Sequence, residues 1–155
     1  ARPDEPLRRL VLRLAVEKAQ ATAARHAGAH VLAADTLVAV GLRILGKPED
    51  EADARRMLGL MSGRAHRIMT GVAVVNPEGK LSSRISETRL KFKRLEAREI
   101  DAYIAGGEWK GAAGAYKIQG SAGAFVTELS GSFTGVVGLP LYETLALLRG
   151  SGWAQ

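Results

Sequence analysis

The segment that most limits the fold is "HVLAADTLVAV", residues 30–40. Its length and its valine and leucine content predict a β-strand, and such a continuous apolar run is typical of a strand covered on both faces. Asp35 interrupts the run at its centre. A buried, ionised carboxylate without a partner is costly, so the sequence predicts that Asp35 is paired, protonated or bound to a metal.

The remaining segments alternate between helical and strand-like patterns. Helices are expected at 4–27, 49–62, 97–107 and 139–150, strands at 65–76 and 81–95, a short strand "RIL" after Gly41, and strands or loop edges at 114–120 and 123–131. Asp4 and Asp50 are the expected caps of the first two helices. This order predicts an α/β or α+β fold, a mixed sheet flanked by helices, in a single domain spanning 1–155.

Lys18 lies on the apolar side of the first expected helix. At about 100° per residue, one stripe of this helix collects Leu7, Leu10, Val11, Leu14, Ala15 and Ala21. Lys18 falls near the middle of the stripe, where its ammonium group must either extend to the helix edge or meet an anion. Extension to the edge is the commoner outcome for lysine, and both alternatives stay open.

Residues 41–47, "GLRILGK", have the spacing of a phosphate-binding loop, with two glycines four residues apart and then a lysine. The next residue in such a loop carries a hydroxyl, but here it is Pro48, which also lacks a backbone donor. The residues between the glycines are strand-like, whereas a phosphate-binding loop leads directly into a helix. The segment is therefore interpreted as a turn between strands that projects Lys47, which can still bind an anion.

The formal charge of +6 and the isoelectric point of about 10.0 suit an anionic partner, such as a nucleotide, a nucleic acid or a membrane surface. The few aromatic residues are not interleaved with basic ones, which argues against a nucleic-acid partner. His26, His30 and His66 are interpreted as surface or capping residues, and their spacing forms no zinc site. The sequence has no cysteine, no membrane-length apolar run and no secretory signal, so we expect a cytoplasmic protein without a membrane partner.

One acid and two cations therefore need an explanation: Asp35, Lys18 and Lys47. They could form an internal ion pair, in which opposite charges offset each other's desolvation. Alternatively, Asp35 holds Mg²⁺ and the lysines contact a polyphosphate. The excess of positive charge favours the second interpretation.

Five segments together resemble the Maf nucleotide pyrophosphatases: "AADT", "ILGKP", "MLxxMSGxxHxxxTGV", "AGAYxIQG" and "GSFTGVVGLPLYET". They follow the family's order and spacing through nearly all of residues 7–149. The resemblance implies a fold like that of the inosine-triphosphate pyrophosphatases and the hydrolysis of nucleoside triphosphates to monophosphate and pyrophosphate with a divalent metal, Mg²⁺ or Mn²⁺. It makes Asp35 the metal ligand or the base that activates water, and Lys18 and Lys47 phosphate contacts.

Within the family, "ADT" together with "IQG" is similar to the branch that acts on dTTP and UTP. The resemblance makes Thr36 and Gln119 candidate contacts to the base or another part of the substrate, with modified pyrimidine nucleotides as a further substrate class. The Gln119 amide can donate to O4 and accept from N3–H of such a base. Because family members are often dimers, the resemblance also implies a homodimer.

The chain departs from the family pattern in two places. Family members normally begin with a strand, a Ser-x-Ser-Pro-Arg-Arg loop and an acidic pair, whereas this sequence starts beyond the loop. The family's usual "KAG" lysine falls on Ala112, with Lys110 two residues earlier. If the loop were absent from the protein, the alternative function would be a non-catalytic nucleotide- or nucleic-acid-binding domain.

Overall fold

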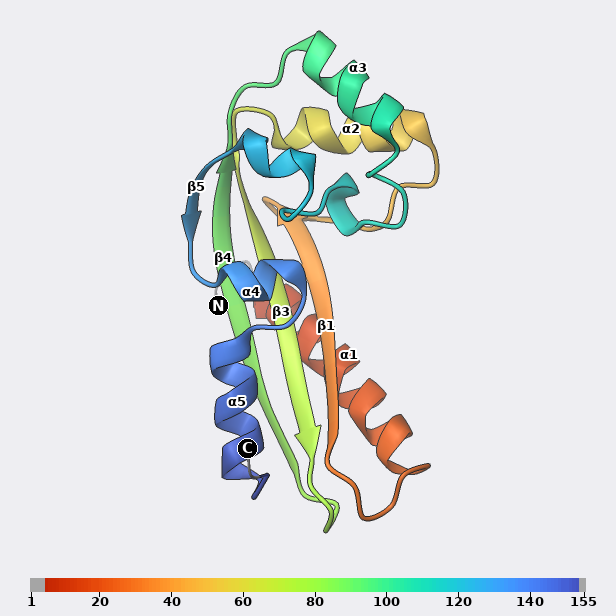
Figure 1. Ribbon diagram of the computed structural model, residues 1–155, viewed down its shortest axis with the longest axis vertical. Coiled ribbons are helices and arrows are strands. Elements are labelled where there is room, and N and C mark those ends of the chain that lie inside the picture. Colours follow the sequence, from red (N-terminus) through yellow and green to blue (C-terminus); the bar gives the residue numbers. More distant parts are fainter. Residues whose placement is uncertain (1–4, 154–155) are drawn as a thin grey trace. The chain divides into compact units, whose positions relative to one another are not determined.

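A computed structural model describes residues 5–153 of the chain. Its elements are α1 (Glu5–Ala23), β1 (Val31–Val40), β2 (Arg43–Leu45), α2 (Glu51–Met61), β3 (Ala65–Val75), β4 (Leu81–Phe92), α3 (Ala97–Gly106), the short 3-10 helices η1 (Ala113–Ala115) and η2 (Ser121–Phe125), β5 (Val126–Ser130), α4 (Phe133–Val137) and α5 (Leu141–Gly150) (Figure 1). Within these residues the strands form one five-stranded antiparallel sheet in the order β2-β1-β3-β4-β5. The expected α/β fold, a sheet flanked by helices, is confirmed.

Most boundaries follow local signals in the sequence. The Asp50 carboxylate accepts the backbone N–H of Asp53 at 2.8 Å, so the predicted cap of α2 is confirmed, whereas the predicted cap Asp4 lies outside the described residues. Residues 114–120 contain no strand, because the chain there makes η1 and a turn. No helix was predicted at α4, which begins where Ser132 Oγ accepts the N–H of Gly135 at 2.9 Å.

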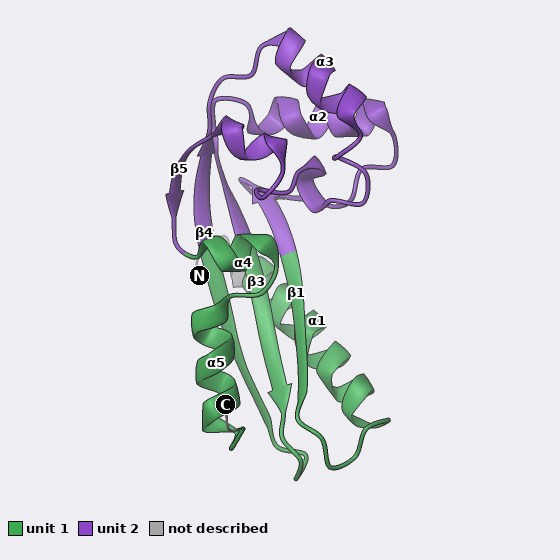
Figure 2. Cartoon of the chain, viewed as in Figure 1, with its two compact units in different colours: residues 1–36, 69–87, 132–155 green, residues 37–68, 88–131 purple. Residues whose placement is uncertain are grey.

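The chain divides into two compact units, each assembled from distant segments (Figure 2). Unit 1 combines the described parts of residues 1–36 and 132–155 with residues 69–87, and unit 2 combines residues 37–68 and 88–131. Strands β1, β3 and β4 contribute residues to both units. A division by compactness does not test whether 1–155 is one domain, which stays a prediction.

In unit 1, helices pack on both faces of the strands. Neighbouring strand residues point to opposite faces, so Ala73 and Val75 face α1 while Val72 and Val74 face α5. On the first face the core contains Ala15, Ala19, Val31, Ala73 and Val75, and on the second it contains Val72, Val74 and Leu147. Small alanine side chains at the first interface allow α1 to lie close to the sheet.

The buried stripe of α1 differs from the predicted one. Leu7, Val11 and Ala15 are buried as expected, but Ala19 continues the stripe and Ala21 is exposed. The buried residues of α1 are spaced four apart and end at Ala19, so Lys18 lies beside this stripe and not within it. The prediction that Lys18 sits near the centre of the apolar face was wrong, because 57% of its side chain is exposed.

Gly71 on β3 is where α1 comes nearest to the sheet. A Cβ atom at this position would lie 2.7 Å from the carbonyl oxygen of Val11, a backbone atom that cannot rotate away. We therefore expect Gly71→Ala to lower the free energy of unfolding by about 1–3 kcal/mol, measured by urea denaturation. Gly59→Ala is the matched control, because α2 leaves open space around Gly59 and alanine favours a helix. Equal stability of the two variants would contradict this account of the contact.

Unit 2 contains a cluster of rings that are scattered in the sequence. His66, Phe92, Tyr103, Tyr116 and Phe125 meet edge to face, with ring centroids 4.9–5.9 Å apart. The interpretation of His66 as a surface or capping residue was wrong, since only 2% of it is exposed. The alternation of β3 places His66 on the same face as buried Ile68 and Thr70, and rings from other segments cover it.

None of the helices among residues 5–153 has the combined length and hydropathy that crossing a membrane would require.

Candidate functional site

The clearest polar feature of unit 1 is an ion pair between α1 and β1. Lys18 Nζ lies 2.9 Å from Asp35 Oδ1 and 3.4 Å from the carbonyl oxygen of Ala34. Of the two outcomes considered for Lys18, the one in which its ammonium meets an anion is therefore observed. The structure brings together two of the predicted site residues, which are 17 positions apart in the sequence.

Asp35 is less buried than its sequence context predicted. Its side chain is 21% exposed, and residues 33–37 of β1 are all only partly buried. The expectation of a strand covered on both faces was wrong for its central part, because Leu32 is exposed and full burial resumes only at Val38. Because the Asp35 side chain is partly exposed, its carboxylate loses less hydration than a fully buried one would, and solvent and ligands can reach it.

Thr36 points away from Asp35. The Thr70 hydroxyl donates to the Gly135 carbonyl at 2.9 Å, and the Thr36 and Thr70 hydroxyl oxygens are 3.0 Å apart. Since Thr70 has only one hydroxyl proton, Thr36 donates its own to Thr70. Adjacent strand residues face opposite sides of a sheet, so the Asp35 and Thr36 side chains do not converge. A substrate contact by Thr36 stays a prediction.

Lys47 and Gln119 belong to unit 2. Both side chains are exposed, and neither makes a hydrogen bond or ion pair within the described part of the chain. Their segments are nevertheless joined, because the Gly114 N–H donates to the Gly46 carbonyl at 3.0 Å. Lys47 follows Gly46 directly, and Gln119 lies in the turn that follows η1. Unit 2 therefore carries a cation and an amide on linked segments, both available to a ligand.

The donor atoms near Asp35 indicate how a metal ion could be held. Across residues 5–153, no three His, Cys, Asp or Glu side chains gather into a metal-binding cluster. Lys18 contacts Oδ1, while Oδ2 has no hydrogen bond within the same residues. Mg²⁺ commonly uses one or two carboxylates and takes its other ligands from water and substrate phosphates. One free carboxylate oxygen is compatible with a metal that would arrive with a polyphosphate, and metal binding by Asp35 stays a prediction.

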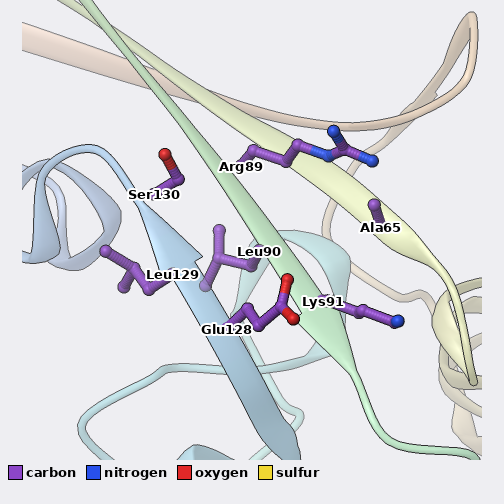
Figure 3. A pocket seen from close by; sticks show the side chains of 7 residues that line it. All are labelled: Ala65, Arg89, Leu90, Lys91, Glu128, Leu129 and Ser130. Carbon is purple, nitrogen blue, oxygen red and sulfur yellow. The ribbon is translucent and has the colours of Figure 1, made fainter.

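A separate pocket of about 550 Å³ lies beside β4 and β5 in unit 2 (Figure 3). Its lining contains Ala65, Arg89, Leu90, Lys91, Glu128, Leu129 and Ser130. Arg89 and Lys91 extend toward the same side of β4 because they are two residues apart on a strand (Figure 3). None of the five predicted site residues lines this pocket.

Sequence reasoning gave no role in the site to Thr70, which is hydrogen-bonded to Thr36, or to His66, which is hydrogen-bonded to Tyr116. Thr70 and His66 both occur in the "MSGxxHxxxTGV" segment, yet their hydrogen bonds to α4 and Tyr116 are not visible in it. The alternation of β3, which places both on one face, was the available signal.

The family's usual "KAG" lysine falls on Ala112, which is buried in this structure. The ammonium of nearby Lys110 lies 5.7 Å from the Trp109 ring centre.

Comparison with known proteins places the chain among Maf-like proteins, both by a family model and by individual relatives. The family model for Maf-like proteins matches residues 1–151. A dTTP/UTP pyrophosphatase of Caulobacter vibrioides is 57% identical over 150 residues, covering 97% of this chain and 78% of the relative. Proteins of the same name from Maricaulis maris and Novosphingobium aromaticivorans are each 61% identical, over 93% and 91% of this chain and 69% and 70% of their own lengths. The chain belongs to the family of Maf-like proteins.

Proposed function

We propose that the protein hydrolyses UTP and dTTP to the nucleoside monophosphate and pyrophosphate. The relatives of 57–61% identity are named dTTP/UTP pyrophosphatases, and this supports a nucleoside triphosphate pyrophosphatase activity for the chain. The observation that carries the proposal is the Lys18–Asp35 pair, an acid and a cation 2.9 Å apart and open to solvent. Modified pyrimidine nucleotides with the same base edge are further candidate substrates.

In the proposed reaction, Asp35 accepts a proton from a water molecule that attacks the α-phosphorus. The new oxygen–phosphorus bond forms as the α–β anhydride bond breaks, and pyrophosphate leaves. Lys18 and Lys47 neutralise negative charge on the phosphates, and the 57% exposure of Lys18 allows its ammonium to exchange Asp35 for a phosphate oxygen. A divalent metal, Mg²⁺ or Mn²⁺, would be held by Asp35 and, when bound, would neutralise the triphosphate and polarise the water.

The test is a hydrolysis assay with UTP, dTTP, CTP, ATP and GTP in Mg²⁺ buffer made with ¹⁸O-labelled water. We expect equal amounts of monophosphate and pyrophosphate from UTP and dTTP, with the label in the monophosphate because water attacks the α-phosphorus. Label in pyrophosphate would place the attack at the β-phosphorus. Release of orthophosphate alone, or nucleotide binding without pyrophosphate release, would overturn the proposal.

A further inference from the structure

Gln119 sits in a tight turn that its own side chain does not stabilise. The Gly120 N–H donates to the Lys117 carbonyl at 3.0 Å, closing a turn over residues 117–120. The exposed Gln119 amide makes no hydrogen bond with any residue in the range 5–153. The position of the amide therefore depends on how the turn is attached to the rest of unit 2.

The residue before the turn is anchored in the core of unit 2. The Tyr116 hydroxyl lies 2.6 Å from His66 Nε2, and both residues are at least nine-tenths buried. The Tyr116 ring also packs edge to face on His66 and Phe92. Because Tyr116 directly precedes Lys117, this hydrogen bond fixes the entry to the turn.

The residue after the turn is held by Glu108. Its Oε2 accepts the Ser121 N–H at 3.1 Å and also accepts the Ser121 hydroxyl. The carboxylate lies so near that a Cβ on Gly120 would be 3.2–3.3 Å from three of its atoms. A glycine at position 120 therefore permits Glu108 to hold the exit from the turn.

Backbone strain just before Tyr116 indicates that the surroundings impose this path. Ala115 has φ +71°, in the left-handed region that non-glycine residues seldom adopt. The Tyr103 hydroxyl donates to the Ala115 carbonyl at 2.7 Å, and this bond is buried. Strained backbone persists where neighbouring contacts determine it, and such positions concentrate at functional sites.

We propose that the Tyr116–His66 and Glu108–Ser121 contacts are positioning pairs that hold the turn 117–120 so that Gln119 meets the pyrimidine base. This inference rests on the proposed function and on the prediction from the sequence that Gln119 contacts the base. None of these four residues touches the substrate; each acts through the placement of Gln119. Losing a base contact that is equally strong in the ground and transition states raises KM and leaves kcat unchanged.

The test compares Tyr116→Phe and Glu108→Ala with Gln119→Ala in steady-state kinetics with UTP and ATP. Each positioning variant should raise KM for UTP about tenfold, keep kcat within about twofold, and reduce the preference for UTP over ATP. Adding either change to Gln119→Ala should have no further effect on KM for UTP, because the route through Gln119 is already lost. Full additivity in these double variants would overturn the proposal.

Two further variants separate positioning from general weakening of the fold. Glu108→Gln should restore a near wild-type KM, because its amide oxygen still accepts from Ser121. Ser62→Ala removes a comparable bond elsewhere in unit 2, the 2.7 Å contact with the Leu95 N–H, and should leave the UTP preference unchanged. A loss of preference in Ser62→Ala as large as that in Glu108→Ala would contradict the inference.

Hydrogen exchange of the peptide 114–121 distinguishes failure of this inference from failure of the proposed function. Exchange should be faster in Tyr116→Phe and Glu108→Ala than in the wild type, and unchanged in Ser62→Ala. An inactive wild-type protein would overturn the proposed function and with it the role in base selection. An active wild type whose variants keep slow exchange and unchanged KM would overturn the positioning role alone.

Discussion

Replacing Asp35 by asparagine is expected to lower kcat for UTP by about 10²- to 10⁴-fold, the usual contribution of a general base. Asparagine keeps the shape of the side chain and an oxygen for Lys18, but it cannot accept a proton from water or supply negative charge to a metal. Steady-state release of pyrophosphate measures the effect. The fold should remain, because an ion pair this exposed contributes about 0–1 kcal/mol to stability.

Asp53→Asn is the matched control for this experiment. Asp53 is 23% exposed, close to the 21% of Asp35, and its Oδ1 pairs with Arg56 Nη2 at 2.8 Å. It lies on α2 and belongs to no proposed role, so its replacement should leave kcat unchanged. Equal activity of Asp35→Asn and wild type, at unchanged melting temperature, would remove Asp35 from the mechanism.

Acidification from pH 7 to pH 4 is expected to destabilise the protein through His66. Burial lowers the pKa of His66 from 6.5 to about 4, because the ring cannot be hydrated when charged. Between these values the unfolded chain binds a proton that the folded protein does not, so stability falls as pH falls. The shift corresponds to a loss of about 3 kcal/mol in the free energy of unfolding by pH 4.

Urea denaturation at pH 7, 6, 5 and 4 measures this loss, and His66→Gln isolates it. Glutamine can still form a hydrogen bond with the Tyr116 hydroxyl but does not titrate, so the variant should show a flatter dependence over this range. His26→Gln, at an exposed position, should follow the wild-type curve. Parallel curves for wild type and His66→Gln would show that His66 does not cause the acid sensitivity.

The two predictions concern different physical situations. The Asp35 side chain is partly exposed, so replacing it is expected to lower kcat but to change the free energy of unfolding very little. His66 is enclosed by Phe92 and Tyr116, so it is expected to affect the free energy of unfolding and the way that this free energy changes with pH. Sequence reasoning had placed these two residues in the opposite settings, with Asp35 buried and His66 at the surface.

Local signals in the sequence predicted most of the elements. Asp50 marked the start of α2 through its cap, and the alternation of residues 81–95 marked the long strand β4. The region after residue 113 was less predictable, because η1, η2 and α4 are short and glycine-rich. Their conformations depend on contacts with distant residues, such as the bond from the Gly114 N–H to the Gly46 carbonyl.

The sequence by itself determined the long helices and strands, because periodicity and capping act over a few residues. Its motifs indicated the family, and its apolar patterns singled out Asp35, Lys18 and Lys47 as the charges to explain. Only the tertiary structure decided that Lys18 pairs with Asp35, that Thr36 turns to the other face, and that Tyr116, 50 positions from His66, encloses it. The physical reason is that burial and hydrogen-bond partners depend on residues far apart in the chain, and local sequence patterns do not predict which of these residues come into contact.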